Sequence, residues 1–369
     1  MDARPSNGER RRNRSIGPVK DPIVGRLVEA MPKAELHLHL DGSLRIDTAL
    51  ELARTRDIEA PRTWTGMSRA LIAPMPCKDQ AELLRAFDLP IALMQDAEAL
   101  ERITAELVQA KAADGVRYVE IRWGPLLHVA GGLSLDDGIA AVVRGAREGV
   151  ARTGTTVALI CTALRSHDPD DNVTLAETAA RFRDDGLVGW DLAGPEAAFP
   201  DPAVHGRAFA AARAGGLRIT LHAGEWGGAG QVRRALAMDP ERIAHGPGAI
   251  DDPDLCRELI ERAITLDLCP TSNAQAGIVD GVAAHPLARL HRVGVPVTLS
   301  TDDTTVSDIT LSEEYGRAVQ DIGLTLPELW RIDRRALEVA FAGEASLAPL
   351  RARFDAWAAG IPELTEADA

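Results

Sequence analysis

The sequence predicts an α/β fold, a TIM (β/α)8 barrel with extra helices after the first strand and at the C-terminus. Two observations carry this prediction. Eight short apolar runs recur along the 369 residues, and the stretches between them are rich in Ala, Leu and Arg at helical spacing. Strands that alternate with helices form βα units around a parallel sheet, and α/β barrels of this length commonly form a single domain.

The elements follow in order along the chain. The predicted strands are Glu35–Leu40, Val116–Trp123, Thr156–Leu164, Leu187–Leu192, Arg218–His222, Arg242–His245, Ile264–Cys269 and Val297–Thr301. The first interval is too long for one helix and holds several helical segments, including Asp47–Thr55, Gln80–Met94 and Ala97–Ala113. Later helical segments include Leu135–Arg152, Ala203–Ala214 and Pro253–Arg262, and the stretch from Thr325 to Ala358 predicts further helices. Extra structure after the first strand lies at the mouth of a barrel, where lids and substrate pockets are built.

Composition narrows the classes of protein. The net charge is −14 and the isoelectric point is about 5.2. Nucleic-acid binding needs concentrated Lys and Arg, so we expect no nucleic-acid partner. No apolar run of about 18 residues occurs, so we expect no membrane span. The four cysteines form no CxxC pair, which fits a cytoplasmic protein without a disulfide scaffold.

We expect three segments. Residues 1–20 form a disordered basic tail, residues 21–358 a single barrel domain, and residues 359–369 a flexible tail. The basic tail contains four arginines between residues 10 and 14 and lacks the apolar core of a signal peptide. A weak arm for polyanions is the alternative interpretation of its charge.

The first strand carries the strongest local signal, Glu35-Leu36-His37-Leu38-His39-Leu40-Asp41-Gly42. Residues two apart in a strand face the same side, so His37 and His39 point together and the leucines point the other way. In a barrel the leucines would pack under the helices and the histidines would face the interior. Two imidazoles aimed into one cavity begin a zinc site. A pair of hydrogen-bonded interior histidines is the alternative.

Two more histidines close predicted strands. His222 ends the fifth run in His222-Ala223-Gly224-Glu225, and His245 ends the sixth. Active sites of such barrels lie at the carboxyl ends of the strands. Glu225 is then within reach of the same cavity, as a ligand or as an acid or base. The alternative for Glu225 alone is an acidic residue that starts a helix.

The ends of the fourth and eighth predicted strands add further candidate site residues. Asp302 and Asp303 close the eighth run, and adjacent carboxylates point in different directions, so one can bind a metal while the other meets a ligand. A helix N-cap is the alternative for Asp303. Gly194 follows the fourth run and would let a planar ligand approach the backbone closely.

In these features the sequence resembles the adenosine deaminase family. The resemblance extends from about Pro32 to Ala342 and rests on several motifs in the family's order: PKAELHLHLDGS, GVRYVEIRW, DLAG, LHAGE, RIAHG, CPTSN and STDD. It implies a zinc-dependent hydrolase that converts adenosine or 2'-deoxyadenosine to inosine or 2'-deoxyinosine and ammonia. The implied partner is a small-molecule purine nucleoside.

The resemblance also implies a role for each site residue. His37, His39, His222 and Asp302 would bind one zinc ion (Zn2+) per chain. Glu225 would donate a proton to purine N1, and His245 would orient the attacking hydroxide and stabilise charge. Asp303 would hydrogen-bond purine N7, the Gly194 backbone would meet N3, and Asp41 would lie near the ribose hydroxyls. His39 and Asp302 would adjoin the substrate as well as the metal.

Two positions depart from the family pattern and bear on the substrate. Thr304 stands where the family commonly has proline, and Pro195 stands where it often has an acidic residue. Relatives act on adenine, N6-methylated AMP or aminodeoxyfutalosine. Because Asp41 can bind a sugar hydroxyl and would repel a phosphate, a nucleotide is disfavoured, whereas adenine and aminodeoxyfutalosine stay open.

The sequence argues against three other classes of protein. A cytidine-type deaminase needs HxE followed by PCxxC, which is absent. A two-metal barrel hydrolase often bridges its metals with a modified lysine on the fourth strand, and no lysine follows Lys111. An inactive barrel that only binds purines would be expected to have lost a ligand or the acid, and here every expected position is filled.

Overall fold

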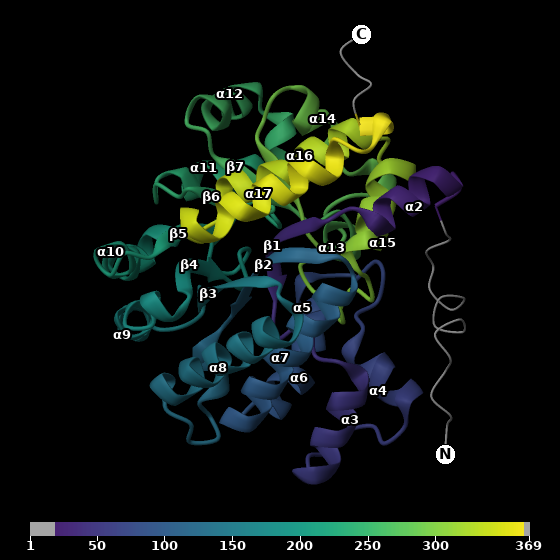
Figure 1. Ribbon diagram of the computed structural model, residues 1–369. Coiled ribbons are helices and arrows are strands. Elements are labelled where there is room, and N and C mark those ends of the chain that lie inside the picture. The colour runs from purple at the N-terminus through teal and green to yellow at the C-terminus, as the bar shows by residue number, and fades with distance from the viewer. Residues whose placement is uncertain (1–18, 365–369) are drawn as a thin grey trace.

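The structure is a computed structural model that describes residues 19–364. Its eight strands are all parallel and lie side by side in the order of the sequence (Figure 1). They are β1 (Lys33–His39), β2 (Val116–Trp123), β3 (Thr156–Leu164), β4 (Leu187–Ala193), β5 (Arg218–His222), β6 (Arg242–Ala244), β7 (Thr265–Leu268) and β8 (Val297–Leu299). The predicted barrel is confirmed, with strand ends that differ from the prediction by one or two residues.

The barrel closes between β1 and the residues that follow β8. Leu38 and Asp302 form a parallel bridge. The amide of His39 donates to the carbonyl of Asp302 at 2.7 Å, and the amide of Asp302 donates to the carbonyl of His37 at 3.1 Å. The closure therefore runs through residues that the sequence singled out for chemistry.

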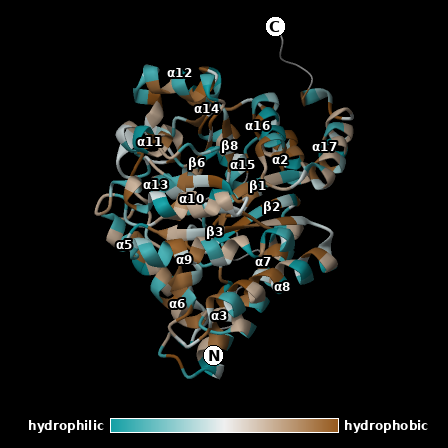
Figure 2. Ribbon diagram, turned by 90° about the vertical axis from the view of Figure 1, so that its left-hand side faces the viewer, coloured by the Kyte–Doolittle hydropathy of each residue, from teal (hydrophilic) through white to brown (hydrophobic). Residues whose placement is uncertain are grey.

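Helices surround the barrel and bury their apolar faces on it (Figure 2). The main helices after β2 are α8 (Leu135–Thr153), α9 (Pro169–Ala180), α10 (Gly206–Ala214), α11 (Gly228–Leu236), α12 (Pro253–Glu261), α13 (Pro270–Gln275), α14 (Leu287–Arg292), α15 (Leu311–Gln320), α16 (Leu326–Val339) and α17 (Glu344–Ala358). Leu36 of β1 packs among apolar side chains of α16 and α17, and Leu38 lies in the main core. The prediction that the β1 leucines face the helices is confirmed.

The long interval after β1 holds several helices. They are α3 (Ile46–Thr55), α4 (Trp64–Leu71), α5 (Gln80–Leu84), η1 (Arg85–Phe87), α6 (Asp88–Leu93) and α7 (Ala97–Ala113), and α2 (Pro22–Ala30) precedes β1. The helical segment predicted over Gln80–Met94 is confirmed to within one residue, as the three consecutive pieces α5, η1 and α6. Pro90, in the first turn of α6, lacks an amide hydrogen and its ring conflicts with the carbonyl four residues earlier, so the α-helix is interrupted before it. The helix predicted over Ala203–Ala214 is a 3-10 turn at Pro202–His205 followed by α10.

Charged side chains fill the inside of the barrel below the strand ends. Arg122 of β2 lies 3.3 Å from Asp191 of β4, and Arg242 of β6 lies 3.1 Å from Asp267 of β7. Glu120 of β2 also pairs with Arg242. All five side chains are almost fully buried. Buried charges are tolerated only when they are paired. The ion pairs therefore hold these charged side chains in fixed positions beneath the site.

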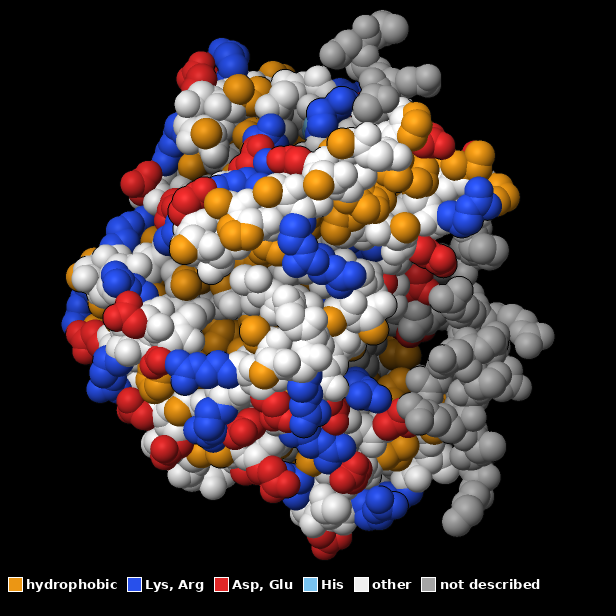
Figure 3. All heavy atoms as spheres, viewed as in Figure 1, with side chains coloured by type: hydrophobic (Ala, Val, Ile, Leu, Met, Phe, Trp, Pro, Cys, Tyr) orange, Lys and Arg blue, Asp and Glu red, His pale blue; other side chains and the backbone are white. Residues whose placement is uncertain are grey.

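Other predictions concern the surface and the termini. Acidic and basic side chains are interspersed on the face shown in Figure 3. No helix in the described part of the chain is long and apolar enough to cross a membrane, and all four cysteines are free and buried. The predicted basic tail over residues 1–20 lies largely outside the described residues, and the predicted flexible tail over residues 359–369 lies partly outside them. Both bounds therefore stay predictions.

Candidate metal and substrate site

The polar residues converge at the carboxyl ends of four strands. His37 and His39 come from β1, His222 ends β5, and His245 and Asp302 follow β6 and β8. His245 and Asp302 have φ angles of 67° and 65°. Residues other than glycine rarely adopt this left-handed conformation, which costs about 1–3 kcal/mol each and collects at functional sites. The surrounding structure therefore holds both residues in a backbone conformation that they would not adopt by themselves.

Three histidines and one aspartate form a tight cluster. The Nε2 atom of His39 lies 3.3 Å from Nε2 of His37 and 3.1 Å from Nε2 of His222. Asp302 Oδ1 lies 2.9 Å from His37 Nε2 and 3.4 Å from His39 Nε2. The candidate ligand atoms of all four residues lie within 4.8 Å of one another. The structure thus brings together the four residues that the sequence proposed as metal ligands.

The chemistry of this cluster fits a divalent metal ion. Burial lowers the pKa values of His37 and His222, so both rings are neutral near pH 7. Three imidazole nitrogens that face one another cannot all be satisfied by hydrogen bonds among themselves, because each Nε2 of a neutral ring is either a donor or an acceptor. Three imidazoles and one carboxylate are the donor set of a mononuclear zinc-type site.

Asp191 orients the imidazole of His222 from behind. The Nδ1 atom of His222 lies 3.0 Å from Asp191 Oδ2, and the hydroxyl of Thr162 donates to the same carboxylate at 3.2 Å. Burial favours the neutral acid, yet His222 and Arg122 hold the pKa of Asp191 below its usual range. An ionised Asp191 accepts a hydrogen bond from the Nδ1–H group of His222. The lone pair on Nε2 of His222 is then free to bind a metal.

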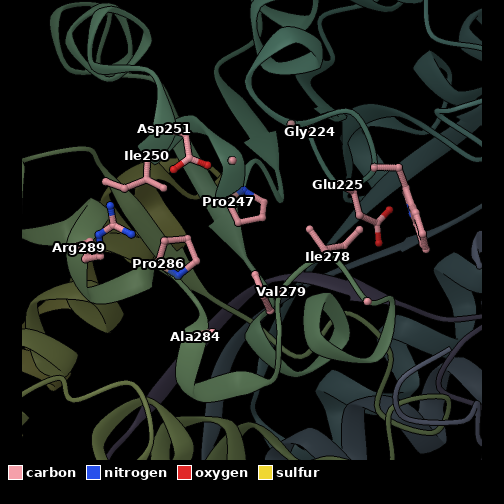
Figure 4. Close-up of a pocket in the computed structure, with 14 residues that line it drawn as sticks. Gly224, Glu225, Pro247, Ile250, Asp251, Ile278, Val279, Ala284, Pro286 and Arg289 are labelled. Carbon is pink, nitrogen blue, oxygen red and sulfur yellow. The ribbon is translucent and has the colours of Figure 1, made fainter. Parts of the chain in front are cut away.

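Glu225 lies beside the cluster at the edge of a cavity. Its Oε1 is 3.9 Å from His245 Nε2. Burial, with the nearby charges of Asp302 and Glu196, raises the pKa of Glu225 well above its usual range. The cavity has a volume of about 470 Å³ and runs between the segments after β5, β6 and β7. Figure 4 shows Glu225 at one end of it and Arg289 at the other.

Two further carboxylates carry oxygens that lack hydrogen-bond partners. Oδ1 of Asp303 and Oδ1 of Asp41 are buried and make no hydrogen bond within the described residues. Burial, with Asp302 and Asp41, raises the pKa of Asp303. Gly194, at the end of β4, has a φ of 99° and is partly exposed. Buried polar atoms are normally paired, so these oxygens suit a bound ligand.

Glu196, two residues after the DLAG motif, is a site residue that was not predicted from the sequence. Its buried carboxylate accepts from the amides of Gly224 and Trp226, each at 2.8 Å, and from Gly227 at 3.2 Å. These amides flank Glu225 and fix its loop. Ser272 was also missed, and its hydroxyl donates to Asp302 Oδ2 at 2.7 Å. The adjacency of Glu196 to the DLAG motif was the one available signal.

The Nδ1 side of His245 has partners that were not predicted from the sequence. Asn273 in α13 contacts His245 Nδ1, and His285 contacts Asn273. His285 received no role from the sequence because it lies in an irregular segment between η6 (Val282–Ala284) and α14. Only the folded chain brings it behind His245.

The fold and the site define a metal-dependent hydrolase of the amidohydrolase class. A family model described as adenosine deaminase matches residues 32–357. The chain is 36% identical to an adenosine deaminase of Vibrio atlanticus over 321 residues, which cover 85% of this chain and 95% of that protein. The chain therefore belongs to the adenosine deaminase family and is an enzyme.

Solved structures agree with this assignment. An adenine deaminase from Arthrobacter aurescens superposes with a TM-score of 0.82 and 26% identity, covering 89% of this chain and all of that one. An amidohydrolase from Burkholderia ambifaria with bound Zn gives a TM-score of 0.83 and 27% identity, covering 93% and 96%. The two neighbours share the fold, one as an adenine deaminase and the other as an amidohydrolase that binds Zn.

Proposed function

We propose that this enzyme hydrolyses adenosine and 2'-deoxyadenosine to the corresponding inosines and ammonia, with one zinc ion per chain. The observation that carries the proposal is the meeting of a His/Asp donor set with the buried Glu225, whose pKa is raised, in one site. A metal donor set alone fits many hydrolyses. A carboxyl group with a raised pKa beside it suits addition of water to a ring whose nitrogen must gain a proton.

His37, His39, His222 and Asp302 are the proposed ligands of the zinc ion. A zinc ion held there would lower the pKa of water to about 7 and so supply hydroxide at neutral pH. His245 lies with its Nε2 3.8 Å from Asp302 Oδ2, which suits a side chain that orients the attacking oxygen. Asp191 keeps His222 in the ring orientation that ligation needs.

Glu225 is the proposed proton donor to purine N1. Attack at C6 breaks the aromaticity of the ring and pushes negative charge onto N1. Because the pKa of Glu225 is raised by burial and by its acidic neighbours, its carboxyl group keeps its proton to a higher pH than an exposed glutamate does and can deliver it as the charge develops. General acid catalysis of this kind contributes about 10²–10⁴ in rate.

Asp303, Gly194 and Asp41 are the proposed contacts to the nucleoside. Purine N7 only accepts hydrogen bonds, so it needs a protonated partner, and the raised pKa of Asp303 supplies one. The backbone of Gly194 would meet N3. Asp41 is the partner for a ribose hydroxyl, since its interactions with His39 offset its burial and lower its pKa, so it is a charged acceptor.

A second candidate is a related 6-aminopurine, adenine or aminodeoxyfutalosine, deaminated by the same mechanism. The structural likeness to an adenine deaminase favours adenine. Asp41 favours the nucleoside, because free adenine has no sugar to meet its carboxylate. An ionised Asp41 would also repel the phosphate of a nucleotide.

The experiment is a substrate panel. Zinc-loaded enzyme is mixed separately with adenosine, adenine, AMP and aminodeoxyfutalosine, and deamination is followed by the change in ultraviolet absorbance. We expect the highest kcat/KM with adenosine. Faster turnover of adenine or aminodeoxyfutalosine would keep the mechanism and change the substrate. No turnover of any member by metal-loaded protein would refute the proposal.

Gly42→Ala should damage substrate binding while sparing the metal. A Cβ atom on Gly42 would lie 1.6 Å from Asp303 Oδ1, so the Asp303 carboxylate has to move. Loss of one hydrogen bond to an ionisable group costs about 1.5–3 kcal/mol, so we expect kcat/KM to fall roughly 10- to 100-fold. Steady-state kinetics with metal analysis check this. Unchanged kcat/KM in the variant would exclude the role assigned to Asp303.

A further inference from the structure

Three hydrogen bonds connect a backbone amide to His245. The amide of Leu287 donates to His285 Nδ1 at 3.2 Å. His285 Nε2 lies 3.1 Å from Asn273 Oδ1, and Asn273 Nδ2 lies 3.1 Å from His245 Nδ1. The three side chains are at most 3% exposed, so water does not compete with these bonds. We call this set of contacts the Asn273 relay.

The relay has a fixed direction. A backbone N–H can only donate, so His285 Nδ1 accepts and the ring keeps its proton on Nε2. His285 Nε2–H must then donate, and it faces the Asn273 carbonyl oxygen. This fixes the orientation of the amide, whose NH2 group donates to His245 Nδ1. Since Nδ1 of His245 accepts, the proton of this ring lies on Nε2.

We infer that the Asn273 relay holds His245 as the Nε2–H tautomer, so that this ring donates a hydrogen bond into the active site and cannot accept a proton there. His245 Nε2 is 3.8 Å from Asp302 Oδ2 and 3.9 Å from Glu225 Oε1. Asn273 and His285 are therefore positioning residues for His245. The consequence for catalysis rests on the proposed function, whereas the tautomer itself does not.

The Nε2–H group of His245 would stabilise negative charge in the active site. An N–H group stabilises negative charge that develops on the attacking oxygen, whereas a bare Nε2 would repel it. A wrong tautomer is costly in enzymes that depend on an oriented imidazole, by about 10⁴ in kcat for the Ser-His-Asp triad. Loss of a single orienting partner typically costs 10- to 100-fold, as for partners of metal-site histidines.

Nitrogen-15 NMR of the histidine-labelled protein tests the tautomer directly. His245 and His285 are assigned with the variants His245→Gln and His285→Gln, and the parent is measured after loading with zinc alone. We expect a protonated Nε2 and an unprotonated Nδ1 in both rings. A proton on Nδ1 of His245 would overturn the inference, whatever substrate the enzyme takes.

A matched pair of variants tests the catalytic consequence. Asn273→Leu removes the relay. Asn172→Leu removes a similar buried contact, since Asn172 Nδ2 lies 3.0 Å from Nδ1 of His205 outside the proposed site. With the fastest 6-aminopurine substrate, Asn273→Leu should lose about 10- to 100-fold in kcat with little change in KM or zinc content. Asn172→Leu should lose thermal stability and keep kcat.

Near-parental kcat in Asn273→Leu, or equal losses of kcat in both variants, would contradict the inference. If Asn273→Leu does not fold, His285→Gln and His285→Leu replace it. Glutamine offers an acceptor toward Leu287 and an N–H toward Asn273, so it should restore much of the kcat that leucine loses. Equal kcat in these two variants would also count against the relay. Inactivity of the parent on every substrate would refute the proposed function, and the NMR result would still decide the tautomer.

Discussion

Glu225→Gln is expected to abolish nearly all turnover while the zinc content stays at one per chain. Glutamine keeps the size of the side chain but cannot release a proton, so N1 would gain charge without compensation. The expected loss in kcat is about 10²–10⁴. Because Glu225 is absent from the cluster of candidate ligands, KM and metal affinity should change little. Stopped assays at high enzyme concentration measure the residual rate.

A suitable control is Glu328→Gln. Glu328 is also largely buried and accepts from the backbone amide of Thr325 at 2.8 Å, but it caps α16 away from the proposed ligands. Its replacement should lower thermal stability without lowering kcat. If Glu225→Gln turns over at a rate near that of the parent, another group delivers the proton.

His222→Ala is expected to lose both metal and activity. The imidazole supplies the Nε2 atom nearest to His39, at 3.1 Å, and its Nδ1 lies 3.0 Å from the buried carboxylate of Asp191. The variant keeps only three of the four ligands and leaves Asp191 with Arg122 as its nearest cation. We expect zinc affinity to fall by more than roughly 100-fold, beyond the loss typical of an outer partner. Metal analysis after dialysis, together with kcat, checks this.

His205→Ala provides the comparison for His222→Ala. His205 is buried and hydrogen-bonded to Asn172, and it lies outside the ligand cluster. It should therefore keep one zinc ion per chain despite a loss of stability. Full zinc occupancy in His222→Ala would remove His222 from the ligand set and require a different donor.

The barrel could be predicted from the sequence because its signal is local. Each strand is a short apolar run followed by polar residues, and the two-residue alternation in β1 separates Leu36 and Leu38 from His37 and His39. The division of the helical segment Gln80–Met94 into three pieces was not predicted, because a composition favourable to helix hides the effect of Pro90, which depends on one missing amide hydrogen.

The partners of the site could not be predicted, because they are defined by distance in space. Glu196 follows β4, yet its carboxylate binds amides after β5. His285 reaches His245 only through Asn273. No periodicity in the sequence encodes such contacts, whereas the repeated placement of histidine at strand ends was visible without a structure.

The two departures from the family pattern have structural counterparts. Because Thr304 is not proline, its amide can donate to Ser43 Oγ, at 3.3 Å. Pro195 accepts at its carbonyl from the amides of Ala198 and Phe199, at 3.1 and 3.0 Å, and the acidic side chain beside it, Glu196, points to the Glu225 loop. Both positions therefore stabilise the loops around the proposed substrate.

The closure of the barrel through Asp302 has a consequence for synthesis of the protein. Residues near the two sides of this closure, such as Glu35 and Thr301, are 266 positions apart in sequence. Ribosomes add about 5–20 residues per second, so on the order of 10 to 50 s separates the appearance of the first histidines from that of the aspartate. A nascent chain exposes His37 and His39 long before it can complete the proposed ligand set. The four proposed ligands can therefore meet only after Asp302 has been synthesised.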